Sequence, residues 1–110
     1  MKQLPALTAS QANDLQHERL LGIRCGIEKE SLRAQPSGAL ALTPHPLVLG
    51  SALTHPSITT DFSESQVELV TGVHKGVKAA IDELTQIHQF TYRTMQALGD
   101  EMLWVSSMPC

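Results

Sequence analysis

The chain is 110 residues long, 42% hydrophobic and 17% charged, with a net charge of −3. This size suits one small domain with its own core, and mild acidity without a basic run argues against nucleic acid as a partner. No apolar run approaches the roughly 20 residues that cross a bilayer. Cys25 and Cys110 lack the close spacing of a metal site, so we expect a reduced, cytoplasmic setting.

A helix over about residues 9–21 is expected first, followed by a strand over about 23–34. Apolar and polar side chains alternate in this strand, so Glu28 and Glu30 share the face opposite Ile27. They lie roughly 7 Å apart, and like charges side by side are costly unless something cationic neutralises them. Two interpretations stay open, namely a divalent-cation site and an ordinary strand face with two solvated glutamates.

Three further strands are expected from the middle of the chain. A turn that contains proline and glycine predicts that residues 39–42 return as an antiparallel partner of the first strand. After a long loop with several prolines, alternating stretches predict strands over about 58–62 and 66–71. In each of these two strands an acid, Asp61 or Glu68, lies opposite the apolar residues.

The four acids Glu28, Glu30, Asp61 and Glu68 are therefore expected on one face of a sheet. Carboxylates that converge in this way repel one another unless cations are bound, and ligands that are all oxygen favour magnesium or manganese over zinc. A face that simply meets water is an equally open interpretation. The same alternation places Phe62 among the side chains directed to the core.

Residues 76–98 form the clearest predicted helix, with apolar side chains recurring at every third and fourth position and Gly99 as a stop. We expect it to cover the apolar face of the sheet and to leave the acidic face open. The expected fold class is α+β, with a mainly antiparallel sheet and covering helices. No nucleophilic Ser-His-Asp order or phosphate-binding glycine loop is present, so no catalytic side chain is assigned.

Five segments, in order and with near-family spacing, resemble the N-terminal part of bacterial glutamate–cysteine ligase. They read GIEKESLR (26–33), GSALTH (50–55), ITTDF (58–62), ELVT (68–71) and, after Trp104, SMPC (107–110). The resemblance covers essentially the whole chain. Any one motif is weak evidence, whereas five in sequence make the match specific.

The resemblance implies a fold similar to glutamine synthetase, with a curved, largely antiparallel sheet forming an active-site funnel. It implies an ATP-dependent reaction that joins the γ-carboxylate of glutamate to the amine of cysteine through γ-glutamyl phosphate, as the first step of glutathione synthesis. It also implies Mg²⁺, with Mn²⁺ as an alternative, bridging the ATP phosphates. Phosphoryl transfer needs mainly positioning and charge neutralisation, which agrees with finding no nucleophile.

Site residues are carried over from the family one by one. The resemblance makes Glu28, Glu30, Asp61 and Glu68 metal ligands, which are acids of the family's metal cluster. It places Phe62 near the pocket for the cysteine side chain, and it gives Thr59 and Arg33 a role in orienting substrate.

Family members run to several hundred residues, so residues 1–110 are expected to be the N-terminal fragment of a catalytic domain and to be inactive alone. Two alternatives stay open. One is another ATP-dependent carboxylate–amine ligase of the same superfamily, with a different amine substrate. The other is a non-catalytic fragment that binds divalent metal weakly or associates with another chain through open sheet edges.

Overall fold

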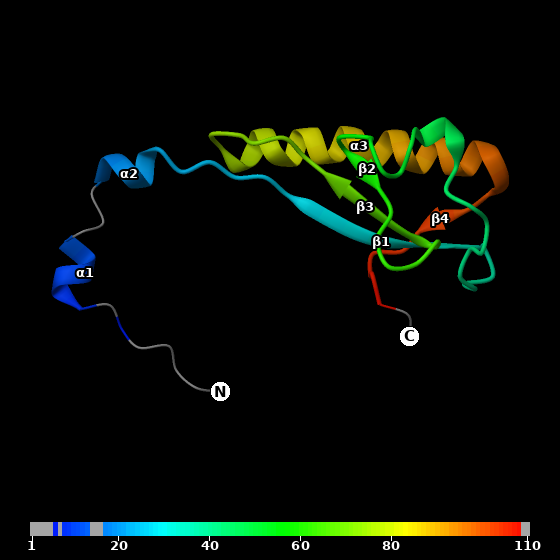
Figure 1. Ribbon diagram of the computed structural model, residues 1–110, viewed down its shortest axis with the longest axis horizontal. Coiled ribbons are helices and arrows are strands. Elements are labelled where there is room, and N and C mark those ends of the chain that lie inside the picture. The colour runs from blue at the N-terminus through cyan, green and yellow to red at the C-terminus, as the bar shows by residue number, and fades with distance from the viewer. Residues whose placement is uncertain (1–5, 7, 14–16, 109–110) are drawn as a thin grey trace.

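The computed structural model describes residues 6, 8–13 and 17–108, in which one long helix packs along an antiparallel sheet (Figure 1). In this part of the chain the sheet has four strands in the order β2-β3-β1-β4. The strands and the long helix are β1 (Glu28–Ala34), β2 (Ile58–Thr59), β3 (Gln66–Val70), β4 (Met102–Leu103) and α3 (Val77–Gly99). The shorter elements are α1 (Ala9–Asn13), α2 (His17–Leu21) and the 3-10 helix η1 (Leu47–Leu49). The expected α+β class with an antiparallel sheet is confirmed.

The pairing of β1 with β3 decides which side chains share a face. Glu30 lies opposite Glu68, and Lys29 lies opposite Leu69. Because successive side chains of a strand point to opposite faces, one face carries the glutamates and the other carries Val67 and Leu69 of β3. β2 extends the same pattern, with Thr59 opposite Glu68.

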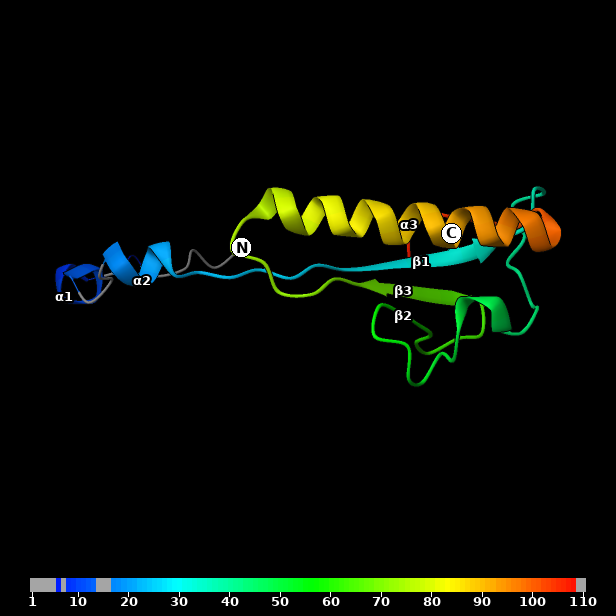
Figure 2. The same ribbon diagram turned by 90° about the horizontal axis from the view of Figure 1, so that it is seen from above.

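The apolar face is covered by α3, which runs along β1 and β3 in both views (Figures 1 and 2). The core consists of side chains that are at least 98% buried and come from η1, β2, β3 and α3, namely Leu49, Ile58, Val67, Leu69 and Met95. Burying such a side chain stabilises the fold by about 1.5–3 kcal/mol. No helix among the described residues combines the length and the apolar character needed to span a bilayer.

Several observed elements are shorter than the expected ones. The segment 39–42 makes only a single bridge, between Leu40 and Ala34, because β3 already occupies that edge of β1 from Glu28 to Leu32. The strand expected over 58–62 ends at Thr59, and the one expected over 23–34 begins at Glu28 after an isolated bridge at Cys25. The other expected elements are close to β3 and α3.

The helix expected over 9–21 is described as α1 and α2, and residues 14–16 between them lie outside the described part. This N-terminal arm extends away from the sheet and α3 (Figure 1). The chain accordingly measures 56 × 32 × 22 Å, with a radius of gyration of 18.4 Å. A compact domain of this size has about 13 Å. The core therefore lies within the part of the chain that follows the arm.

A fully buried arginine ties the far end of β1 to three other segments. The Arg33 guanidinium donates hydrogen bonds to the Glu101 carboxylate at 2.8 Å, the Thr43 hydroxyl at 2.9 Å and the Glu64 carbonyl at 2.7 Å. Its side chain is 0% exposed and that of Glu101 is 14% exposed. These contacts fix the loops before η1 and before β3, and the connection from α3 to β4, against β1.

Removing the charge from Glu101 should destabilise the fold, because it leaves the Arg33 cation buried without a counter-charge. We expect Glu101→Gln to lower the free energy of unfolding by about 3–5 kcal/mol. The matched control, Asp82→Asn, breaks the exposed pair between Lys78 and Asp82 and should cost at most about 1 kcal/mol. Urea unfolding followed by circular dichroism measures both, and equal losses would contradict the stabilising role of the buried pair.

Candidate functional site

The open face of the sheet gathers acidic side chains from three consecutive segments. Glu28 and Glu30 come from β1, and Glu68 comes from the neighbouring position of β3. Asp61 follows β2 by two residues. We call Glu28, Glu30, Asp61 and Glu68 the acidic face. Glu68 is half-buried, and the other three are exposed.

The electrostatics of Glu68 indicate that these acids lie near one another. Burial raises the pKa of the Glu68 carboxyl, and the carboxylates of Glu28, Asp61 and Glu30 raise it further, in that order. Each of these three charges disfavours the ionised form of Glu68 because like charges repel at short range. The expected gathering of the acids therefore has electrostatic support around Glu68.

The donor chemistry of the acidic face fits a hard divalent cation, because its ligand atoms are all carboxylate oxygens. As the side chains stand, however, no three His, Cys, Asp or Glu residues among those described are close enough together to hold a metal ion. Mg²⁺ keeps several waters and is commonly bound through one or two carboxylates plus substrate phosphates. The described side chains therefore form no closed metal cage, and a metal-binding role of the acidic face stays a prediction.

Two polar side chains near the acids were not identified from the sequence. Gln66 donates a hydrogen bond from Nε2 to Oε2 of Glu30 at 3.1 Å. The Thr71 hydroxyl accepts a bond from the Ile27 amide at 2.9 Å and so joins the start of β1 to the end of β3. Both contacts join residues more than 30 positions apart, so no local pattern in the sequence signals them.

The expected substrate residues have different surroundings. Thr59 is half-buried on the same face as Glu68. Phe62 is 97% exposed, so its expected core position is wrong: β2 ends before Phe62, and the strand alternation no longer applies. Arg33 is buried on the helix side of the sheet, where its guanidinium is engaged by Thr43, Glu64 and Glu101. The structure therefore brings Thr59, but not Arg33, to the face that carries the acids.

One pocket, of about 320 Å³, borders the acidic face at Glu28 and is lined also by Gly26, Thr71 and Val73. A β-carbon on Gly26 would come within 3.3 Å of the Gly72 carbonyl oxygen, so this glycine allows a close approach of two backbone segments.

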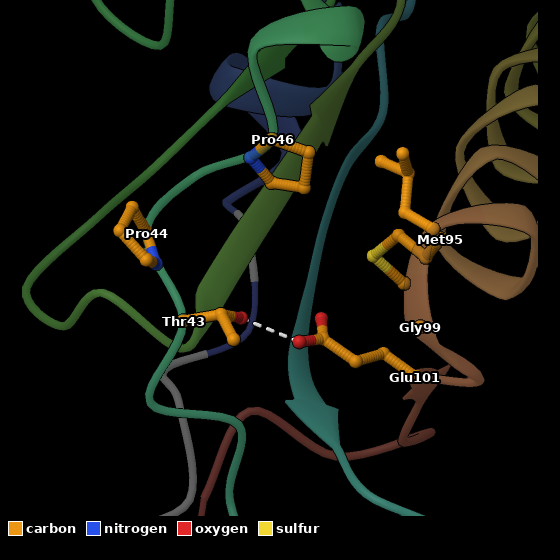
Figure 3. A pocket seen from close by; sticks show the side chains of 7 residues that line it. Thr43, Pro44, Pro46, Met95, Gly99 and Glu101 are labelled. Carbon is orange, nitrogen blue, oxygen red and sulfur yellow. Dashed lines mark hydrogen bonds between the residues drawn. The ribbon is translucent and has the colours of Figure 1, made fainter.

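A second pocket, of about 270 Å³, lies between the loop at Thr43–Pro46 and the end of α3 (Figure 3). Its ionisable lining residue, Glu101, points toward the Thr43 hydroxyl and is also bound by Arg33. Because both carboxylate oxygens already have partners, this pocket offers little polar chemistry to a ligand. The pocket at Glu28 is the one adjacent to the candidate site.

Comparison with known proteins gives consistent similarities. A model of the family described as glutamate-cysteine ligase matches residues 8–110. The glutamate–cysteine ligase of Alcanivorax borkumensis is 55% identical over 91 residues, which cover 83% of this chain and 17% of that protein. The corresponding enzyme of Sodalis glossinidius is 48% identical over 105 residues, which cover 96% and 19%.

Solved structures agree with the sequence matches. The glutamate–cysteine ligase of Francisella tularensis, solved in complex with AMP, matches with a TM-score of 0.72 and 46% identity over 78% of this chain and 17% of that one. A bifunctional glutathione synthetase from Pasteurella multocida matches with a TM-score of 0.73 and 39% identity over 86% and 14%. The chain thus spans less than a fifth of the length of these relatives.

The raised pKa of Glu68 predicts a pH-dependent cost to folding. Between the ordinary value of 4.5 and the raised folded value, the native state binds the proton more tightly, so stability falls as the pH rises through this window. Glu68→Gln removes the cost. We expect the urea midpoint of this variant to exceed that of the unsubstituted chain near pH 7, and the gain to shrink at about pH 4. A gain that is equal at both pH values would contradict the role of the charge.

Proposed function

The chain belongs to the glutamate–cysteine ligase family, and on that premise we propose that it forms the N-terminal part of an enzyme that makes γ-glutamylcysteine. In the proposed reaction, ATP phosphorylates the γ-carboxylate of glutamate, and the amine of cysteine then displaces phosphate from γ-glutamyl phosphate. This is the first step of glutathione synthesis. The observation that carries the proposal is the acidic face, which lies on an open sheet surface within a chain that matches the family over residues 8–110.

The role proposed for this segment is to hold divalent metal and to position substrate. Glu28, Glu30, Asp61 and Glu68 supply carboxylate oxygens for Mg²⁺, or for Mn²⁺ in its place. When bound, the metal would supply charge neutralisation during phosphoryl transfer. The four carboxylates would hold it together with ligands from outside this group.

Two residues near the acidic face are proposed to contact substrate. Phe62 directly follows Asp61 and is 97% exposed. Its ring is therefore free to make an apolar contact with the cysteine substrate. Thr59 lies opposite Glu68 in the register and would help to orient substrate beside the metal. For Arg33, a buried position favours an indirect role, in which it holds the loop that follows Phe62 through the Glu64 carbonyl.

The remaining parts of the site would come from the rest of a family-length protein. We propose that the sheet described here continues into a funnel similar to that of glutamine synthetase, with the nucleotide pocket formed largely outside residues 1–110. Proximity contributes roughly 7–11 kcal/mol only when all reactants are held together, so the chain alone is expected to be inactive. Another amine in place of cysteine remains the alternative substrate.

A chimeric enzyme tests the proposal. The matched segment of the Alcanivorax relative is replaced by the aligned residues of this chain, and γ-glutamylcysteine formation is measured with ATP, Mg²⁺, glutamate and cysteine. We expect the chimera to be active and Glu28→Gln to lower kcat about a hundredfold or more, because a carboxylate that stabilises charge in the transition state is lost.

The control is Asp82→Asn, which removes a carboxylate from the exposed pair on α3 and should leave turnover unchanged. The unsubstituted chain alone gives the background. A folded chimera without ligase activity would overturn the proposed function. Near-normal turnover of Glu28→Gln at saturating Mg²⁺ would exclude Glu28 as a metal ligand.

A further inference from the structure

One edge of β1 is open over the first part of the strand. The Leu32 amide donates to the Ser106 carbonyl at 3.1 Å, and the Leu32 carbonyl accepts from the Trp104 amide at 2.8 Å. Backbone groups alternate in direction along a strand, so those of Glu28 and Glu30 point to the same side as those of Leu32. Within the described part of the chain, no backbone hydrogen bond reaches Glu28 or Glu30 from this side, because the pairing with β4 lies further along β1.

The long helix covers the side of β1 on which this edge lies. α3 contacts β3 on one side of β1 and β4 on the other. Seen from above, it runs on the side of β1 that faces away from β3 (Figure 2). A strand added at the open edge would therefore lie beneath α3, which would cover one of its faces as it covers β3.

The helix side of this edge carries a cation that has no counter-charge among the described residues. Lys29 is half-buried and lies opposite Leu69, so its side chain faces α3. Its ammonium donates a hydrogen bond to the hydroxyl of Ser31, which is 0% exposed. None of the ion pairs in the described part of the chain involves Lys29. A partly buried charge is costly to desolvate unless an opposite charge lies beside it.

A side chain of α3 near Lys29 also lacks a polar partner. Burial lowers the pKa of the His88 imidazole, and the nearby charge of Lys29 lowers it further. The His88 Nδ1 atom is buried without a hydrogen-bond partner among the described residues, and the ring stacks on Tyr92 with the centroids 6.3 Å apart. Buried polar groups of folded proteins are nearly always hydrogen-bonded. One carboxylate would pair with the Lys29 ammonium and accept a hydrogen bond from the protonated Nδ1 of His88.

A second copy of this chain suits the edge poorly. Antiparallel pairing of two β1 strands through this edge would place the glutamates of both copies side by side on one face, where like charges destabilise a sheet. On the helix side, β1 offers Lys29, Ser31 and Arg33, none of which is acidic. By contrast, the matched part of this chain covers only 17% and 19% of the two relatives compared by sequence, so most of a family-length protein lies outside it.

We propose that the open edge of β1 pairs with a strand from the part of a family-length protein outside residues 1–110, and that this strand places a carboxylate opposite Lys29. The inference rests on the proposed function, since it presumes that the chain is part of such a protein. The backbone groups of Glu28 and Glu30 would bind the strand, and Lys29 and His88 would bind its carboxylate. This carboxylate would lie on the helix side of the sheet, away from the acidic face.

Amide hydrogen exchange tests the pairing, measured residue by residue on the isolated chain and on the chimera with the Alcanivorax relative. In the isolated chain, the Glu28 and Glu30 amides should exchange rapidly, whereas the Lys29 amide, which points toward β3, should be protected. In the chimera, we expect exchange at Glu28 and Glu30 to slow by about a hundredfold or more relative to Lys29 in the same protein. The comparison with Lys29 corrects for a difference in overall stability.

Substitution of Lys29 tests the carboxylate. In the isolated chain, Lys29→Met removes a cation that pairs with none of the described carboxylates, so the thermal unfolding midpoint should stay or rise. In the chimera, the same change leaves the proposed carboxylate buried without its partner, so the midpoint should fall. Lys29→Arg keeps the charge and should keep the midpoint of the chimera. The control, Lys78→Met, breaks the exposed pair on α3 and should have the same small effect in both proteins.

The outcomes separate the inference from the function on which it rests. Rapid exchange at Glu28 and Glu30 in the chimera would overturn the proposed strand, even if the chimera makes γ-glutamylcysteine. Protection that occurs only in the concentrated isolated chain would assign the edge to a second copy and would also overturn it. Protected amides in an inactive chimera would overturn the proposed function and support the strand.

The carboxylate has its own criterion. An unchanged or raised midpoint of the Lys29→Met chimera would overturn it. If this chimera fails to fold, folding of the Lys29→Arg chimera supports the carboxylate, and failure of both variants overturns the role of the charge.

Discussion

The antiparallel register between β1 and β3 is the constraint on which both the core and the candidate site depend. Glu30 faces Glu68 across the strands, and in the same register Lys29 faces Leu69. A slip of β3 by one residue would turn Val67 and Leu69 toward water and Glu68 toward α3. The burial of apolar side chains under the helix therefore holds the carboxylates together on the open face, despite their mutual repulsion.

The buried ion pair between Arg33 and Glu101 complements this register at the far end of β1. Arg33 lies on the helix side, and its bond to the Glu64 carbonyl fixes the end of the segment that carries Asp61. A buried cation is costly to desolvate, and its well-bonded partners offset that cost. The Arg33 cation is thus neutralised on the helix side of the sheet, whereas the acidic face keeps charges that destabilise it.

Much of this arrangement could be predicted from residues 66–70 and 77–99, because their hydrophobic periods of two and 3.6 agree with β3 and α3. In β1 the period applies less well, since its last four residues are all buried. The period of two also predicted the shared face of Glu28, Glu30 and Glu68. It failed at Phe62, since alternation says nothing about where a short strand ends. It could not reveal the partners of Arg33 or Gln66, because Glu101 lies 68 residues from Arg33 and Glu30 lies 36 residues from Gln66. Such contacts depend on how strands and loops meet in space.

The central proposal is that one open sheet face of this chain binds a divalent cation through acids from three segments. Paramagnetic broadening by substoichiometric Mn²⁺, mapped over the amide resonances of the chain, tests it most directly. The account predicts that broadening centres on Glu28, Glu30, Asp61 and Glu68 together and leaves the exposed side of α3 sharp. Broadening centred elsewhere, for example on Asp82, or confined to one of the four acids, would contradict it.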